Sequence, residues 1–223
     1  MKKLLILLFT IISQINFGQT FKELTDFNKL KTFDGISLKL IQSEENKILI
    51  PVNYQDKIEI ITINDELKIR MKIENTFKGK DVYIELYFKN LDFIDASEGS
   101  YIFNDEPLKQ QHIDLNTKEG AKINLILETE SLTSRAVSGA VLELSGVSKS
   151  NICNLGTGGN LEAKNLKTEQ TNILITTGAE ATIFVTEFVD ANIKTGGELY
   201  VYGNPKKVNK KNFLGGVFKL LKE

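Results

Sequence analysis

The sequence is poor in several residue types that mark particular kinds of site. Its 223 residues include one cysteine, one histidine, three prolines and no tryptophan. Because Cys153 is alone, an internal disulfide and a zinc site of several cysteines are excluded, and we expect this thiol to be a small buried apolar group. With His112 as the only histidine, we also exclude histidine triads and metal sites of several histidines, and we expect this residue in a loop.

Arginine is also scarce, with only Arg70 and Arg135 in the chain. Since Trp and Arg dominate binding hot spots, any partner surface must rely on Lys, Asn, Thr, Tyr and carboxylates. Charged residues nevertheless make up 26% of the chain, 28 basic and 29 acidic. Residues 19–205 hold 20 basic and 28 acidic residues, a net charge of −8, and such an acidic body excludes nucleic acid as the expected partner.

The first eighteen residues are typical of a secretory signal peptide. Lys2 and Lys3 precede an apolar run from Leu4 to Ile15, and the segment ends at Gly18. A run of about twelve apolar residues is too short to span a bilayer, which needs roughly twenty, so cleavage near Gly18 is favoured over a retained anchor. No cysteine follows the run to carry a lipid. The product is therefore expected in the periplasm, on the outer cell surface or outside the cell.

Six glycines recur at nearly constant spacing through the C-terminal half. Each lies roughly 20 residues after the one before it, a period typical of repeat proteins. The residue directly after each glycine is always Ser, Ala or Gly. Around each glycine, small or apolar residues alternate with polar ones at period two, as in strands with one buried face. The six are Gly99, Gly120, Gly139, Gly158, Gly178 and Gly196.

This repeat predicts a parallel β-solenoid with rungs of about twenty residues, because short strands of this kind bury their apolar faces by stacking on copies of themselves. Each glycine would turn a corner with positive φ, and the next side chain would point into a space that only a tiny group can fill. Gly139→Val should then destabilise the protein by on the order of a few kcal/mol, through backbone strain and overpacking. An antiparallel sandwich is the alternative, but residues 92–200 contain no Asn-Gly or Asp-Gly hairpin turn.

No linker divides the chain, so one domain is expected after the signal peptide, residues 1–18. Within the solenoid, residues 19–205, the part from 19 to 90 has alternating strands without the glycine mark and should cap the first rung. Residues 91–205 would form the glycine-marked rungs. In the basic tail, residues 206–223, apolar residues fall at helical spacing and could lie on a membrane, but Gly215 and Gly216 weaken a helix and favour a cap over the last rung.

The order of short motifs resembles a known family. Ser-Gly-Ala and Thr-Gly-Gly units, at residues 137–141 and 194–198, and the closing Val201-Tyr-Gly-Asn-Pro205 are similar to the auto-transporter adhesin head domain, or GIN domain, of Bacteroidetes. The resemblance covers roughly residues 28–218. It implies a right-handed β-solenoid in an exported protein with an adhesive or cell-surface role, and it brings no catalytic residues. The first two rungs depart from the family pattern, with Glu98 and Glu119 before their glycines.

Paired carboxylates are the candidates for ligand binding or chemistry. Three pairs of glutamates share a register in neighbouring rungs, where carboxylates about 5 Å apart could raise one pKa, act as acid and base, or hold a calcium ion. A solvated outer face with flanking lysines is the simpler interpretation. The pairs are Glu98 with Glu119, Glu143 with Glu162, and Glu180 with Glu198.

We therefore predict no catalytic residue, no metal and no cofactor. The expected function is that of a non-enzymatic, adhesin-like exported protein whose partner is a polysaccharide or a cell-surface or envelope protein. A carbohydrate-active enzyme and a lectin-like polysaccharide binder on the same β-helix fold are the alternatives, and a purely structural envelope component is a third. We do not expect the C-terminal tail to associate with a membrane.

Overall fold

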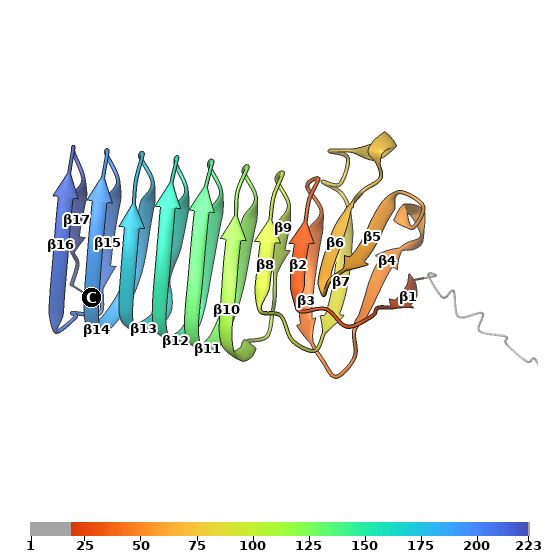
Figure 1. The fold of residues 1–223 in the computed structure, drawn as a ribbon, viewed down its shortest axis with the longest axis horizontal. Helices are drawn as coiled ribbons and strands as arrows, with labels where there is room; N and C mark the ends of the chain where they lie inside the picture. Colours follow the sequence, from red (N-terminus) through yellow and green to blue (C-terminus); the bar gives the residue numbers. More distant parts are fainter. Residues whose placement is uncertain (1–18, 223) are drawn as a thin grey trace, which may run out of the picture.

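The structure is a stack of β rungs closed at one end by antiparallel strands (Figure 1). This computed structural model describes residues 19–222, so the predicted signal peptide lies outside the described residues. The described strands form one hydrogen-bonded system of 17 strands. The helices of this part are two 3₁₀ turns, η1 (Val52–Tyr54) and η2 (Ile73–Asn75), and within residues 19–222 no helix is long and apolar enough to cross a membrane. The predicted all-β parallel solenoid is confirmed.

Each rung consists of strands that meet at a corner, which is a glycine corner in every rung except that of β6 and β7, where residues 72–80 join the strands. Strands leading into the corner form what we call the first face, and strands leaving it form the second face. Short strands of the first face are β2 (Lys29–Thr32), β6 (Glu66–Met71), β8 (Phe93–Ala96) and β16 (Lys207–Phe213). Those of the second face are β3 (Ser37–Gln42), β7 (Tyr83–Phe88), β9 (Tyr101–Phe103), β15 (Glu198–Tyr202) and β17 (Val217–Leu220). Longer strands pass from one face to the other: β10 (Leu108–Thr117), β11 (Lys122–Val137), β12 (Val141–Gly156), β13 (Asn160–Ile175) and β14 (Glu180–Lys194).

Neighbouring rungs pair in parallel register, so equivalent side chains form columns along the stack. On the second face Ile123 pairs with Leu142, which pairs with Leu161, and all three are buried. Buried and outward residues alternate along the strands, as where half-buried Glu143 lies between buried Leu142 and Leu144. The core is therefore a set of Leu, Ile and Ala columns, and each rung buries its apolar side chains largely against its neighbours.

Every glycine corner is a pair of residues with positive φ, the second of which is glycine. This is the backbone of a type I′ turn, in which glycine suits the second position. The glycine N–H donates to the carbonyl of the next corner, as from Gly120 to Ser138 over 3.1 Å. Besides the six corners of the sequence repeat, two more have this form. The full set is Asp34-Gly35, Glu98-Gly99, Glu119-Gly120, Ser138-Gly139, Thr157-Gly158, Thr177-Gly178, Thr195-Gly196 and Leu214-Gly215.

The residue after a corner glycine is packed, whereas the glycine itself faces open space. Ala121 and Ala140 are fully buried, while a Cβ added at Gly139 would meet no heavy atom within 4 Å. The overpacking expected for Gly139→Val is therefore wrong, and only backbone strain at a φ of 71° remains. The tight space lies one residue further along, where a Cβ at Gly159 would be 2.2 Å from the carbonyl oxygen of Ala136.

The N-terminal strands interleave with the stack. β2 pairs with β6 on one side and β8 on the other, and β3 pairs likewise with β7 and β9. The strands β2 and β3 come first in the chain but form the second rung of the stack. The strands β6 and β7 come later in the chain and form the terminal rung beside it. Three antiparallel strands cover that end: β5 (Ile58–Ile63) pairs with β6, β4 (Lys47–Pro51) with β7, and β1 (Gln19–Glu23) with β4.

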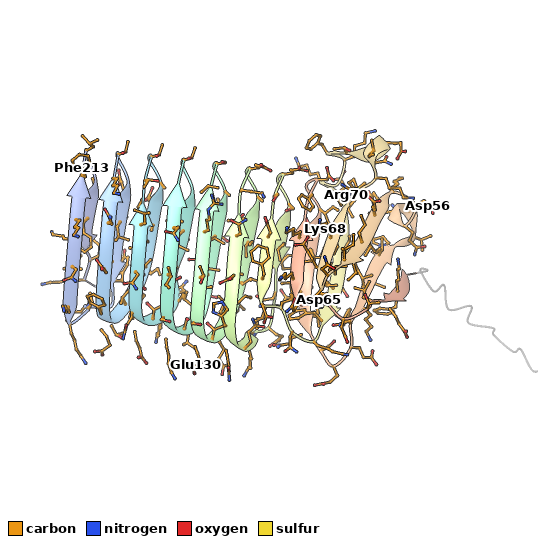
Figure 2. The ribbon with its side chains drawn as sticks, viewed as in Figure 1. Asp56, Asp65, Lys68, Arg70, Glu130 and Phe213 are labelled. Atoms are coloured by element: carbon orange, nitrogen blue, oxygen red, sulfur yellow. The ribbon has the colours of Figure 1, made fainter. Side chains whose placement is uncertain are left out.

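The basic C-terminal residues form the last described rung, as strands β16 and β17 rather than the helix that their spacing allowed. Two columns of inward side chains that are apolar in the preceding rung contain a charged or a polar residue in this rung. Lys210 stands in the column of Ala191, and Asn212 stands in the column of Ile193. Because charged and polar groups at such positions discourage further strand pairing, this rung is a poor template for another strand. Phe213 lies beside the last corner (Figure 2).

Candidate functional site

The structure places each of the three glutamate pairs in neighbouring rungs. Glu143 and Glu162 are register partners on the second face, as are Glu180 and Glu198. At the corners, the N–H of Gly99 donates over 3.0 Å to the carbonyl of Glu119, which brings the corner of Glu98 beside the next one. The glycines of the sequence repeat all have φ between 66° and 73°.

The outward carboxylates have polar partners on an open surface. The Nζ of Lys122 lies 2.6 Å from a carboxylate oxygen of Glu143, and the hydroxyl of Tyr200 donates to Glu198 over 2.6 Å. Within residues 19–222 no group of three His, Cys, Asp or Glu side chains is arranged to hold a metal ion. Such contacts are typical of a solvated polar face, and they provide no dry pocket in which a carboxylate could act as a general acid.

The corner column contains a third acidic residue beside Glu98 and Glu119. Asp34 occupies the equivalent corner of the adjoining rung, where Thr32 pairs with Ala96. Burial, followed by the charges of Asp34 and Glu119, raises the pKa of Glu98 above its ordinary value. Asp34 itself is buried and accepts two backbone hydrogen bonds, so its role is to hold a loop.

His112 lies in strand β10 and not in the expected loop. Its Nδ1 is 2.8 Å from the hydroxyl of Ser131, and its Nε2 is 2.9 Å from Asp114. Excluding a triad because the chain has one histidine is wrong, since a triad needs only one. Ser131, however, lies within parallel ladders to both neighbouring rungs. The backbone N–H groups of these ladders bond between strands, so they do not converge on the Ser131 hydroxyl as oxyanion donors.

Cys153 is buried and unpaired, as expected from its isolation in the sequence. Burial raises the pKa of its thiol to about 12. The thiolate that would be needed for nucleophilic or metal chemistry is therefore disfavoured. Cys153 is part of the inward column that also contains Ser134 and Ile173.

A group of aromatic rings, which sequence reasoning missed, lies on the second face at the closed end. We call Phe21, Tyr83, Tyr87, Tyr101 and Phe103 the aromatic patch. Tyr101 and Phe103 stack with ring centroids 5.0 Å apart, Tyr83 approaches Phe103 at 6.2 Å, and Phe21 meets Tyr87 edge-on at 5.8 Å. Phe21 is 51% exposed and Tyr83 is 42% exposed, so the patch is an outer surface.

The rings meet because β3 lies between β7 and β9. Ser37 of β3 pairs with Tyr83 on one side and with Tyr101 on the other. Its small side chain leaves room above it, across which Tyr83 and Phe103 approach each other. Period-two alternation could have shown that these aromatic side chains point outward, but the order of the strands in the stack brings them together.

Charged groups border the aromatic patch. Lys39 is the register partner of Phe103 and forms an ion pair with Asp105. The hydrogen bond that the Lys39 ammonium donates to the Asp105 carboxylate raises the pKa of Lys39. The hydroxyl of Tyr87 donates to Glu85 over 3.1 Å. Burial, followed by this hydrogen bond, raises the pKa of Tyr87 and keeps its hydroxyl protonated at neutral pH. Lys39 and Asp105 also line a hollow of about 450 Å³ beside the patch.

Comparison with protein families gives one match over most of the chain. The family model described as "Putative auto-transporter adhesin, head GIN domain" matches residues 26–205. No curated protein matches the chain. The matched range begins just before β2 and ends after β15, so it includes the aromatic rings of β7 and β9 and every corner from Asp34-Gly35 to Thr195-Gly196.

Solved bacterial structures share the fold. A crystal structure described as a putative adhesin from Bacteroides fragilis has a TM-score of 0.80 and 19% identity, covering 91% of this chain and 96% of that chain. A putative adhesin from Parabacteroides distasonis has a TM-score of 0.73 and 17% identity, covering 92% and 96%. One from Parabacteroides merdae has a TM-score of 0.68 and 19% identity, covering 92% and 95%. At these identities the likeness shows the architecture.

Proposed function

Because the chain belongs to the family of putative auto-transporter adhesins with a head GIN domain, we propose that it is an exported, non-enzymatic, adhesin-like protein. The aromatic patch would bind a polysaccharide of the cell envelope or its surroundings. This proposal depends on one observation, the stacked and partly exposed rings beside a hollow of about 450 Å³. Aromatic side chains are enriched in binding surfaces because they offer a large contact area with few rotatable bonds.

The aromatic patch offers both kinds of contact that a sugar ring can make. The rings of Tyr101 and Phe103 stack on each other with their planes 13° apart, and the outer faces and edges of this stacked pair, the platform, can meet the apolar C–H face of a pyranose. Sugar hydroxyls can exchange hydrogen bonds with the groups around the platform. These include Asn124, whose amide lies 3.5 Å from the Tyr101 hydroxyl, and Lys122, whose Nζ lies 5.8 Å from the Tyr101 ring centroid.

Strands rather than loops hold the platform. Tyr101 and Phe103 are both in β9, which pairs with β3 on one side and β11 on the other. The loop that follows is fixed by Asn104, whose side chain accepts from the N–H and donates to the carbonyl of Ile126. Because these elements are already ordered, little conformational entropy is lost on binding.

The test is binding of purified residues 19–223 to immobilised bacterial and host polysaccharides and envelope proteins. We expect at least one polysaccharide to bind. Tyr101→Ala combined with Phe103→Ala should weaken that binding by about tenfold or more, as for central aromatic contacts in other interfaces. The matched control is Tyr200→Ala combined with Tyr202→Ala in β15, at the other end of the same face, which should leave the affinity unchanged.

Two outcomes contradict the proposal. Binding only to a protein, with an affinity that the patch variants do not alter, would remove the aromatic patch from the function. Turnover of a polysaccharide that Glu143→Gln or Glu162→Gln abolishes would instead support a carbohydrate-active enzyme. Release of reducing ends from each polysaccharide of the panel measures that turnover.

A further inference from the structure

Between β6 and β7 the chain forms a loop that stands clear of the stack at its closed end (Figure 1). We call residues 72–80 the crest loop. Ile73 is 84% exposed and Phe77 is 72% exposed, the two highest values among the exposed large apolar residues of the described chain. Arg70, in the β6 strand, lies near the foot of this loop (Figure 2). The loop therefore projects two apolar side chains into water.

The crest loop is held in one conformation by Asp34 beneath it. The buried Asp34 carboxylate accepts the N–H of Met71 over 3.0 Å and the N–H of Phe77 over 3.1 Å, which joins the two limbs of the loop. The N–H of Gly79 donates to the Asp34 carbonyl over 3.1 Å. A Cβ at Gly79 would lie only 2.3 Å from that oxygen, so glycine permits this close approach. The exposure of the two apolar side chains is thus built into the fold.

Phe77 adopts a backbone conformation that its residue type seldom has. Its φ is 61°, in the left-handed region that favours glycine and asparagine. The ring gains little from the core of its own chain, because most of it is in water. Strained residues and exposed apolar side chains both gather at binding sites. An aromatic ring with both properties therefore indicates contact with something outside the chain.

Three lysines share the crest loop with the two apolar side chains. Lys72, Lys78 and Lys80 belong to the loop, against a single acidic residue, Glu74. This positive charge is local, since residues 19–205 as a whole carry a net charge of −8. Apolar side chains flanked by lysine are complementary to an anionic membrane surface. The apolar groups enter the boundary between headgroups and acyl chains, while the lysines meet the anionic headgroups.

The geometry points to the crest loop as a docking site for an anionic lipid bilayer, with Ile73 and Phe77 as the inserting side chains. A bilayer is favoured over a protein partner because a narrow projecting loop offers far less than the roughly 800 Å² per partner of a stable protein interface. The site is separate from the aromatic patch. The loop projects beyond the stack, whereas the patch covers the second face, and neither proposal depends on the other.

The absence of tryptophan from the sequence allows a direct test. Phe77→Trp places a single tryptophan on the crest loop, and Ile63→Trp places one at the end of β5, where the native side chain is 59% exposed. Each purified protein is mixed with vesicles of phosphatidylcholine and with vesicles of equimolar phosphatidylcholine and phosphatidylglycerol. We expect the emission of Phe77→Trp to shift to the blue with the anionic vesicles, and that of Ile63→Trp to stay unchanged.

Further variants in the Phe77→Trp protein separate charge from apolar contact. Replacing Lys72, Lys78 and Lys80 by glutamine should weaken vesicle binding by about a hundredfold at low salt, because each lysine near an anionic surface contributes roughly fivefold. Ile73→Ser should weaken it by about tenfold through lost apolar burial. Added salt should weaken vesicle binding of the Phe77→Trp protein more than that of the variant in which Lys72, Lys78 and Lys80 are also replaced.

An unshifted Phe77→Trp emission with anionic vesicles, in a protein with the circular dichroism spectrum of the wild type, would overturn the proposal. Equal binding to the neutral and anionic vesicles would do the same. Tyr101→Ala combined with Phe103→Ala should leave vesicle binding unchanged. A failure of lipid docking is thereby distinguishable from a failure of polysaccharide binding.

Discussion

The two ends of the stack are built by different rules. From β10 onward each rung contacts the next along the chain, so that pairs such as Ile123 with Leu142, one repeat apart, recur. In the N-terminal third, distant strands lie side by side, and Lys29 pairs with both Glu66 and Phe93. The regular part repeats its surface from rung to rung. The closed end carries antiparallel strands, the aromatic patch and the crest loop, which do not repeat.

This difference shows where specific chemistry can arise in a stacked protein. A repeat is constrained at each position, because every inward side chain must fit the one above and the one below. The end of the stack is released from that rule, and it must also be covered to protect exposed strand edges. In this chain the first rungs at the closed end provide most of the surfaces to which we assign binding, since Tyr101 and Phe103 are in β9 and the crest loop joins β6 and β7. The regular rungs from β10 onward serve as the scaffold.

The largest expected effect tests the packing rule of the scaffold. Gly159→Val should destabilise the protein by about 3 kcal/mol or more, because its Cβ would be 2.2 Å from a backbone oxygen that cannot rotate away. Gly139→Val, at an open corner, should cost only about 1–2 kcal/mol through strain. Urea unfolding measures both. Equal losses would contradict our description of the corner.

The second prediction compares two residues of one column at the boundary between the regions. Asp34→Ala should destabilise the protein by about 2–3 kcal/mol, because the N–H groups of Met71 and Phe77 lose their acceptor. Glu98 occupies the adjoining corner, and Glu98→Ala should stay within about 0.5 kcal/mol of the wild type. Thermal unfolding of the two variants checks this, and the reverse order would show that Asp34 does not anchor the crest loop.

A smaller effect, of opposite sign, is expected at the later corners. Thr157, Thr177 and Thr195 have φ values of 52°, 54° and 51°, which β-branched residues seldom adopt. Thr157→Asn should therefore stabilise the protein by about 0.5–1 kcal/mol, since Asn-Gly suits a type I′ turn. Ser138→Asn is the control, and it should gain less because serine is not β-branched. A loss of stability in Thr157→Asn would mean that the threonine makes contacts that offset its strain.

The smallest effect concerns the acidic corner column. Burial, and then the neighbouring carboxylates, raise the pKa of Glu98 in the folded state, so the folded protein binds this proton more tightly than the unfolded chain does. Ionisation of Glu98 therefore lowers stability as the pH rises through this raised pKa. Glu98→Gln should melt at a slightly higher temperature than the wild type at pH 7. The difference in melting temperature between the two proteins should disappear below about pH 4, where Glu98 is protonated in both the folded and the unfolded state.

Much of the rung region could be predicted because its contacts recur at one period. Leu214-Gly215 also continues that period, one repeat after Gly196, but the apolar residues around it fit a helical spacing as well. Asp34-Gly35 is harder to recognise, because Ile36 follows it instead of a small residue and the next corner of this form comes only after β8. Both corners have the two positive φ values of the other six, but the residues around them match only part of the pattern that marks those six in the sequence.

The aromatic patch could not be predicted because it depends on strand order. The alternation of Tyr83, Glu85 and Tyr87 indicates which side chains point outward. It does not indicate that β3, a strand much earlier in the chain, separates β7 from β9. The crest loop was missed for a related reason. Its anchor, Asp34, is far from Phe77 in sequence, and no local pattern joins them.

The division between scaffold and binding end is tested most directly by removing one rung. Deletion of the segment 140–158 joins Gly139 to Gly159 and removes one full repeat, which keeps the columns in register. The affinity of this folded, shortened protein for the polysaccharide that the wild type binds is then measured by calorimetry. We predict an affinity within about twofold of the wild type, because stacked repeats interact mainly with their nearest neighbours. Loss of binding in the shortened protein, with the aromatic patch intact, would contradict the account.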